Sequence, residues 1–338
     1  MPVTPRGSLD ISVAETPSAV SIAAARTAIE EIALSAPKAV ATLPLAVTIA
    51  PGTDLSLHLE GVSMLRARLR EEMITWASIE AIAEGTALID DDFTLYRFLH
   101  AREFNQDNAV SMFRGACAWR AERAVNAIFS ELHPAAPTSV RHAASREYFY
   151  AGYCGVNKTG GPVVCERLGV VDLRALNQQP EALSLMLDAY CSYLESLFRM
   201  VRLASARSGR LVRATIVVDA SGVSFSTLRN IGVIKTVASI GPPNYPEVTS
   251  RVYIVNAPVL FSAMWNIISP LLPAHTRTKV KIYASDFLPH LLQDVDADQL
   301  PDFLGGARQP GDVALIPAAK RLPSTLGRDL AAAAADGG

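Results

Sequence analysis

Cysteine is scarce in this sequence of 338 residues, and the spacing of its cysteines excludes two common kinds of site. No CxxC pair and no metal-like spacing with histidine occurs among the four, which are Cys117, Cys154, Cys165 and Cys191. A zinc site or a redox-active dithiol therefore has little support. We predict four small buried side chains in a reducing compartment.

Long hydrophobic runs are absent as well. No stretch of about 18 apolar residues escapes interruption by proline, asparagine or a charged residue, so we predict no transmembrane helix. The N-terminus lacks the basic and then apolar pattern of a secretory signal, and four acidic residues argue against a transit peptide: Asp10, Glu15, Glu30 and Glu31. These absences predict a cytoplasmic protein.

The sequence carries no large excess of either charge. Its formal net charge is −2, from 31 Lys and Arg against 33 Asp and Glu. A nucleic-acid-binding protein usually shows a basic excess or a basic stripe, so we predict that nucleic acid is not a partner. With 50% hydrophobic residues, the chain is able to bury at least one large core.

Catalytic and metal-binding motifs are missing too. The sequence has no GxSxG elbow, no GxGxxG after a strand, no phosphate-binding GxxxxGKS or GxxxxGKT, and no ligand spacing among its six histidines. Asp219 follows a buried strand, where open α/β sheets place ligands, but no second carboxylate or histidine lies near it in sequence. We interpret Asp219 as fixing the next turn, and predict a protein without catalysis, metal or cofactor. A hydrolase or dehydrogenase using Asp219 is the enzymatic alternative.

Composition and periodicity divide the chain into four parts. Residues 1–55 are rich in Ala, Ser, Pro and Thr and predict a flexible extension. Residues 56–130 have helical periodicity, with "VSMLRARLREEMITWASIEAIAEG" predicted to end on its glycine. Residues 140–306 predict an α/β domain, and residues 307–338 predict a flexible tail.

The α/β part alternates strand and helix signals. A turn-rich "GVNKTGG" between two apolar segments predicts a hairpin. The apolar strands "ATIVVDASG", "RVYIVN" and "KVKIYAS" are separated by helical stretches, "FSTLRNIGVIKTVASIG" and "VLFSAMWNIIS". Strand, helix, strand repeats require crossovers, so we predict a mixed and mostly parallel sheet.

A basic run follows the long helical segment that starts at Pro180. It holds five arginines and no acidic residue: Arg199, Arg202, Arg207, Arg210 and Arg213. The first interpretation is cations at a helix C-terminus followed by a solvated loop. The alternative is a patch for anionic membrane lipids.

The stretch "NAPVLFSAMWNIISPLLP" (256–273) is the most unusual part of the sequence, because it has no charge and three prolines. On a helical wheel its apolar side chains cover an arc of about 240°, against roughly 100° for an ordinary surface helix. Prolines limit it to about three turns, too short to cross a bilayer. We predict that one part of this helix packs on the sheet and the rest meets a second apolar partner: another subunit, a lipid or a membrane.

Five segments in order resemble the landmarks of the CRAL-TRIO lipid-transfer family, across about residues 57–306. They are "DDFTLYRFLHAREFNQDNAVSMFRGACAWR", "GGPVVCERLGVVDLRAL", "TIVVDASGVS", "NYPEVTSRVYIVNAPVLFSAMWNIISPLLPAHTRTKVKI" and "LPDFLGG". The resemblance implies an α/β lipid-binding fold after a small all-helical module. In this fold a sheet forms the floor of an apolar cavity, and a helical gate covers it. The apolar segment 256–273 corresponds to that gate.

The resemblance also implies site residues. A phosphoinositide head group would be bound by Arg102, Thr276 and Lys279, while Tyr153 matches one of two tyrosines that bind choline in the family prototype and Val164 occupies the position of the other. An acidic partner of the inositol falls near Thr236, and the basic residue expected after Arg102 is Glu103. The predicted cavity and gate residues are Thr215, Val217, Val164, Phe261, Met264, Trp265 and Ile268.

The leading hypothesis is a monomeric lipid-binding and transfer protein that holds one phospholipid, phosphatidylinositol, as cargo and associates transiently with membranes. One alternative is a carrier of another hydrophobic small molecule, such as a tocopherol-like or retinoid-like ligand. Another is a regulatory module that senses lipid and acts through its N-terminal extension.

Overall fold

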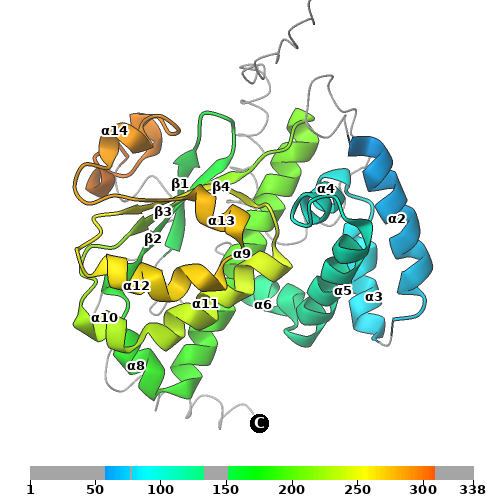
Figure 1. Ribbon diagram of the computed structural model, residues 1–338, viewed down its shortest axis with the longest axis horizontal. Coiled ribbons are helices and arrows are strands. Elements are labelled where there is room, and N and C mark those ends of the chain that lie inside the picture. Colours follow the sequence, from blue (N-terminus) through cyan, green and yellow to red (C-terminus); the bar gives the residue numbers. More distant parts are fainter. Residues whose placement is uncertain (1–57, 77, 133–150, 309–338) are drawn as a thin grey trace, which may run out of the picture.

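The computed structural model describes residues 58–76, 78–132 and 151–308. The predicted extension at 1–55 lies outside these residues, as does the tail from residue 309. The first described part is the predicted helical module, which lies to one side of the sheet (Figure 1). Its helices are α2 (Leu59–Met73), α3 (Ile79–Leu88), α4 (Asp92–His100), α5 (Gln106–Glu122) and α6 (Val125–Leu132).

The first helical stretch of the module is two helices, not the single one that its periodicity predicted. The chain leaves α2 at Ile74, and Ser78 starts α3 by accepting a hydrogen bond from the Ala81 amide. Gly85, predicted as a helix end, lies inside α3. A β-carbon on Gly85 would lie 2.6 Å from the sulfur of Met73, so the absent side chain lets the two helices pack closely.

The α/β part contains a five-stranded sheet in the order β1-β2-β3-β4-β5. β1 pairs antiparallel with β2 through the predicted hairpin, and the other neighbours are parallel, as predicted. The strands are β1 (Ala151–Val156), β2 (Pro162–Arg167), β3 (Ala214–Asp219), β4 (Thr249–Val255) and β5 (Val280–Ile282).

Helices that connect the parallel strands cover one face of the sheet. They are α8 (Leu173–Gln178), α9 (Pro180–Ser208), α10 (Phe225–Arg229), α11 (Ile231–Asn244), α12 (Phe261–Ile268) and α13 (Ala274–Lys279). Short helices after β5 cover the opposite face, where α14 (Leu288–Leu291) lies (Figure 1). Because both faces are covered, the strands are apolar on both sides.

The long helix α9 runs between the sheet and the helical module (Figure 1). Two arginines of the basic run, Arg199 and Arg202, are ion-paired here, with Glu195 at 2.6 Å and with the α4 cap Asp91 at 2.6 Å. Arg213 pairs with Glu247. These three arginines therefore hold parts of the fold together, so they do not form an open patch for anionic lipid.

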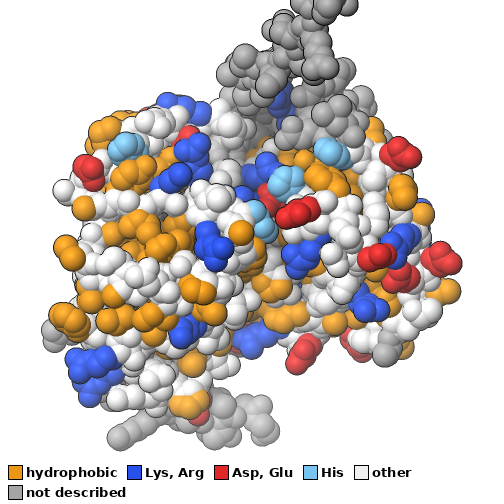
Figure 2. All heavy atoms as spheres, viewed as in Figure 1, with side chains coloured by type: hydrophobic (Ala, Val, Ile, Leu, Met, Phe, Trp, Pro, Cys, Tyr) orange, Lys and Arg blue, Asp and Glu red, His pale blue; other side chains and the backbone are white. Residues whose placement is uncertain are grey.

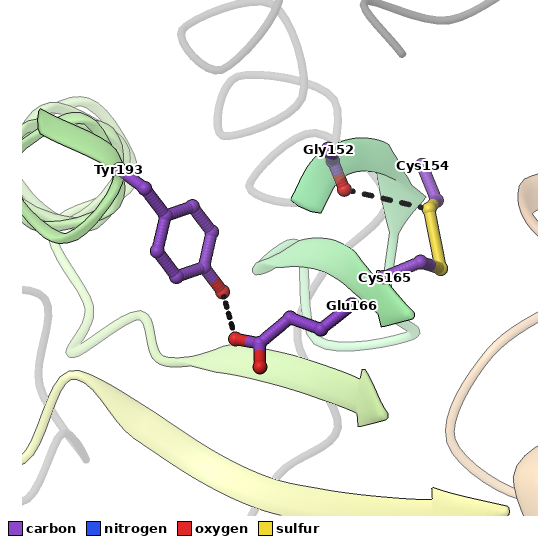
Figure 3. The surroundings of a disulfide bond; sticks show 5 residues. All are labelled: Gly152, Cys154, Cys165, Glu166 and Tyr193. Carbon is purple, nitrogen blue, oxygen red and sulfur yellow. Dashed lines mark hydrogen bonds between the residues drawn. A yellow bond between two sulfur atoms is a disulfide. The ribbon is translucent and has the colours of Figure 1, made fainter. Parts of the chain in front are cut away.

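The cysteines differ from the prediction in one respect. Cys117 and Cys191 are buried and free, as predicted, but Cys154 of β1 and Cys165 of β2 form a disulfide (Figure 3). The two lie 11 residues apart, and the hairpin turn between them brings their strands side by side. Spacing rules for metal or redox motifs do not detect such a pair, because pairing depends on strand register.

Candidate ligand-binding cavity

An apolar cavity of about 320 Å³ lies between the helix-covered face of the sheet and helices α9, α11 and α12. The strand side chains of its floor are mostly aliphatic: Ile216, Val218, Val252, Ile254 and Val280. Leu194 and Leu197 of α9 line it from one helix, and Val233 and Val237 of α11 from another. This size falls at the lower end of the range typical of small-molecule sites.

Residues 256–273 contain α12, which forms part of the cavity wall. Phe261, Trp265 and Ile268 line the cavity, as predicted for gate residues. Met264 is fully buried but does not line the cavity, because it packs into the core between α12 and the sheet. The regular helix is shorter than predicted, since Val259 and Leu260 belong to the turn that precedes it.

The opposite side of this segment faces outward and stays apolar. Val259 is 94% exposed, and Ile267 and Leu271 are also exposed. Phe225, at the start of α10, is 70% exposed. Hydrophobic side chains gather on this face of the molecule over α12 and the strand ends beside it (Figure 2). We call Val259, Ile267, Leu271 and Phe225 the outer apolar surface.

A charged cluster lies where the chain enters β4, at the amino ends of the parallel strands. Its centre is the buried carboxylate of Glu247. Lys279 Nζ lies 2.7 Å from Glu247 Oε1, and Arg213 lies 3.3 Å from Oε2. His100 Nδ1 and His275 Nε2 each lie 3.4 Å from a carboxylate oxygen of Glu247. We call these five residues the Glu247 cluster.

Backbone geometry fixes the position of Glu247. Its φ is +54°, a left-handed conformation that is uncommon for a residue with a side chain. Arg97, fully buried on α4, donates hydrogen bonds to the backbone carbonyls of Glu247 and Val212. The helical module therefore holds the corner of the α/β part from which the Glu247 side chain projects.

The cluster is electrostatically biased toward anions. Burial alone would raise the pKa of the Glu247 carboxyl, but the contact with His100, the hydrogen bond from Lys279 and the charge of Arg213 hold that pKa well below its usual range. The carboxylate is therefore charged, and the basic side chains of Lys279 and Arg213 and two histidines surround it. The apolar cavity is lined at this end by four polar residues: Glu247, Thr276, Lys279 and His275. The charged cluster and the apolar interior are therefore parts of one continuous cavity.

The structure brings together two of the predicted head-group residues, Thr276 and Lys279. Arg102 lies outside the cavity lining, beside a groove between α5 and α11, and donates to the carbonyl of Ala101 at 3.0 Å. Tyr153 is partly buried in β1 and packs against core residues, not at the cavity. Glu103, the departure after Arg102, is exposed.

The acidic residue of the cluster is not at the position that the family resemblance implies. We expected an acidic partner near Thr236, but Thr236 is exposed on α11 and its hydroxyl bonds to the carbonyl of Gly232. The acidic residue that lines the cavity beside Lys279 is Glu247, in "NYPEV". Its position two residues before a buried strand, next to a proline, was the available signal.

Strand alternation decides which β3 residues reach the cavity. Thr215 and Val217 face the opposite side of the sheet, where Thr215 bonds to Asn157 and Val217 joins the core under α14. Ile216 and Val218 line the cavity in their place. Val164 is on the cavity side but packs under α9 and does not line the cavity. Side chains alternate between the two faces along a strand, so an error of one residue in the predicted register exchanges the residues that face the cavity with those that face away from it.

Asp219 has the structural role that its sequence context suggested. Its carboxylate accepts hydrogen bonds from the amide and hydroxyl of Ser221 at 3.0 and 2.9 Å, and from Asn256 at 3.0 Å. These bonds fix the turn after β3. Among the described residues, no cluster of His, Cys, Asp and Glu suits a metal ion. No helix in the described part of the chain is both long and apolar enough to span a membrane.

The fold defines an α/β protein whose sheet and covering helices enclose an apolar cavity with a charged cluster at one end. Residues 146–306 match the CRAL/TRIO domain family. The Sec14 cytosolic factor of Schizosaccharomyces pombe is 32% identical over 224 residues, which cover 65% of this chain and 77% of that protein. The chain belongs to the CRAL-TRIO family.

A second relative agrees with this assignment, and a solved structure shares the fold. The phosphatidylinositol/phosphatidylcholine transfer protein SFH9 of Arabidopsis thaliana is 30% identical over 221 residues, covering 64% of this chain. The chain spans only 37% of the length of that relative. The crystal structure of Sfh5 shares the fold, with a TM-score of 0.50, 16% identity, and coverage of 94% of this chain and 98% of Sfh5.

Proposed function

We propose that this protein binds one phospholipid, phosphatidylinositol, in its apolar cavity and exchanges it at membrane surfaces. The observation that carries the proposal is the continuity of the cavity with the Glu247 cluster: Thr276 and Lys279 line the same space as Phe261 and Trp265. Transfer proteins for phosphatidylinositol and phosphatidylcholine among the relatives support it. Exchange breaks no covalent bond, so the proposal requires no catalytic group and no cofactor.

The chemistry of the cluster favours inositol over choline. A phosphate is an acceptor and matches the donors of Lys279 and Arg213, while the hydroxyls of inositol are donors that match the charged carboxylate of Glu247. A quaternary ammonium offers no hydrogen-bond donor to that carboxylate. Thr276, on the same helix as Lys279, adds a hydroxyl that both donates and accepts. We place Arg102 at the periphery of this head-group site, where its charge adds to the attraction.

The apolar interior supplies the energy for extracting lipid. Each methylene group removed from water is worth about 0.8 kcal/mol, so a cavity that receives acyl chains lowers the cost of carrying them between membranes. We propose that α12 is the gate, and that the outer apolar surface contacts lipid while the gate is open. The protein then acts as a monomer that associates peripherally and transiently with membranes.

The test is a transfer assay with the purified full chain. Donor vesicles carry radiolabelled phosphatidylinositol, and the label that reaches acceptor vesicles is counted with and without protein. We expect protein-dependent transfer, and one phospholipid per chain in a native mass spectrum. A phosphorus-free bound molecule together with no transfer of phosphatidylinositol would contradict the proposal and favour a carrier of another hydrophobic molecule.

A further inference from the structure

Two histidines of the Glu247 cluster are not among the residues that the family resemblance implies. His100 ends α4, and His275 lies on α13, one helical turn before Lys279. Nδ1 of His100 lies 3.4 Å from Oε2 of Glu247, and Nε2 of His275 lies 3.4 Å from Oε1. Two elements far apart in the sequence therefore bring an imidazole ring to each oxygen of one buried carboxylate.

Each ring turns one nitrogen toward Glu247 and stays partly exposed. The side chain of His100 is 39% exposed and that of His275 is 42% exposed. Among the described residues, no hydrogen bond engages the second nitrogen of either ring. A neutral imidazole has one donor and one acceptor, so a ring whose N–H faces the carboxylate presents an acceptor on its other side. Only the protonated ring donates on both sides.

A phosphodiester distinguishes these two forms of histidine, because it offers acceptors and a negative charge. An unprotonated ring nitrogen repels a phosphate oxygen, whereas a protonated one donates a charge-assisted hydrogen bond to it. His275, Thr276 and Lys279 lie on the same helix, and all three line the cavity. A head group bound by Lys279 therefore lies beside His275. His100 lies at the other oxygen of the carboxylate, outside the cavity lining.

We infer that His275 is a proton-dependent ligand of the head-group phosphate, and that His100 supports it by taking up a proton beside Glu247. The inference rests on the proposed function, because it assigns a regulation to the proposed head-group site. Acidification then strengthens the binding of phosphatidylinositol, and a rise in pH favours its release.

The charges around His275 give the direction of the pH dependence. Burial lowers the pKa of His275, and the charge of Glu247 opposes this shift. Three basic neighbours lower the pKa further: Lys279, His100 and Arg102. The ring is therefore neutral at pH 7 in the empty site. A bound phosphate offsets these positive charges and raises the pKa, so binding takes up a proton and the affinity rises as the pH falls.

The charges around His100 support the same direction. Its Nδ1 is buried without a hydrogen-bond partner among the described residues, so a proton there would be directed at the carboxylate of Glu247. Arg213 contacts the same carboxylate oxygen at 3.3 Å, and Arg97 binds the backbone carbonyl of Glu247. Glu103, three residues beyond His100, is exposed. A proton on His100 offsets the charge of Glu247, which then competes less with phosphate for the cations of the cluster.

The experiment titrates the full chain with dihexanoyl phosphatidylinositol by calorimetry, between about pH 8 and pH 5.5. This short-chain lipid is used as a monomer, so adsorption to a membrane does not contribute. We expect the wild type to bind about tenfold more tightly at the lower pH. His275→Gln keeps an amide toward Glu247 but does not titrate, and should reduce this difference to about threefold. His100→Asn should reduce it to about fivefold, and the double variant should bind equally at both pH values.

The control removes a histidine from outside the site. His290 lies on α14 and stacks on Tyr283 with the ring centroids 4.5 Å apart, on the opposite face of the sheet. His290→Gln should keep the full pH dependence. Thermal unfolding at each pH shows whether each variant is folded. If the double variant unfolds, the two single variants provide the test.

The possible results distinguish this inference from the proposed function. Phosphatidylinositol binding with the same affinity across the pH range overturns the inference alone. Wild-type pH dependence in the double variant also overturns it, because another group, such as Lys279, is then the one that titrates. Absence of phosphatidylinositol binding at every pH overturns the proposed function, and this inference with it.

Discussion

Two buried carboxylates, Glu195 and Glu247, have similar partners and different surroundings. Glu195 of α9 receives Arg120 from α5 at 2.7 Å and Arg199 at 2.6 Å, and Tyr245 donates to it at 3.3 Å. Arg120 also pairs with Glu84 of α3 at 2.7 Å. Arg120 and Glu195 are both almost completely buried. This network connects the helical module to α9, and neither Arg120 nor Glu195 lines the cavity.

The Glu247 cluster has the same kinds of charge, but two of its basic side chains, Lys279 and His275, are partly exposed and line the cavity. Lys279 is 20% exposed and His275 is 42% exposed, while Glu247 itself is 1% exposed. A cation that keeps part of its surface free is able to bind a second anion. The comparison teaches that the accessibility of the partners, and not the presence of a buried ion pair, separates a binding site from a structural bridge.

The largest effect is expected in the structural network. Arg120→Ala leaves Glu84 and Glu195 buried without their shared cation, and should lower the free energy of unfolding by about 3–5 kcal/mol. Chemical denaturation measures this change. Arg68→Ala, which breaks an exposed ion pair with Asp107, is the matched control and should cost about 0–1 kcal/mol. Equal losses in the two variants would remove the distinction between the network and a surface ion pair.

The same network predicts a pH dependence. Burial opposes ionisation of Glu195, but the charges of Arg120 and Arg199 lower its pKa from 4.5 to about 2. Because the folded-state pKa is the lower one, its contribution of about 3 kcal/mol is complete above pH 4.5 and is lost as the pH falls toward 2. The stability difference between wild type and Glu195→Gln should therefore narrow across that window in denaturation curves. A stability difference that stays constant between pH 4.5 and 2 would contradict this prediction.

For a substitution in the Glu247 cluster, we expect weaker binding of phosphatidylinositol. If Lys279 binds the head group as proposed, Lys279→Ala removes a charge-assisted hydrogen bond and should weaken phosphatidylinositol binding about 10- to 100-fold. Lys281→Ala is the matched control, because Lys281 is exposed two residues further along and does not line the cavity. Titration of both variants with phosphatidylinositol vesicles gives the comparison. Similar affinities in the two variants would exclude the cluster as the head-group site.

The smallest effect is expected at the outer apolar surface. Val259→Asp places a charge on a side chain that is 94% exposed, so the fold should be retained while vesicle binding weakens about tenfold. Co-flotation of the protein with vesicles measures the fraction of protein that is bound. Asn266→Asp adds the same charge on the polar side of α12 and is the control. Phe261→Asp would not test the gate in this way, because Phe261 is buried.

Local patterns were sufficient for much of the fold. Alternating apolar strands and helical stretches predicted the parallel sheet, and "GVNKTGG" predicted the hairpin, because backbone periodicity is encoded by neighbours in sequence. The same patterns failed at the break between α2 and α3. There the Ser78 cap and the close packing of Gly85 on Met73 decided the boundary.

The candidate site was less accessible to sequence reasoning. The resemblance to a known family placed Thr276 and Lys279 in the predicted head-group site, and the structure puts both on one short helix that lines the cavity. Glu247 was not predicted there, because its partners come from α4, α13 and the loop before β3. The disulfide of Cys154 with Cys165 was missed for the same reason.

By itself, the sequence determined that residues 256–273 form a short, uncharged and unusually apolar segment, because composition and proline spacing are local properties. Only the tertiary structure decided which of its side chains face the cavity, the core or the outside. It also decided that Ile216 and Val218, and not Thr215 and Val217, face the cavity. Strand register and helix packing make those choices, and they depend on contacts between residues far apart in the chain.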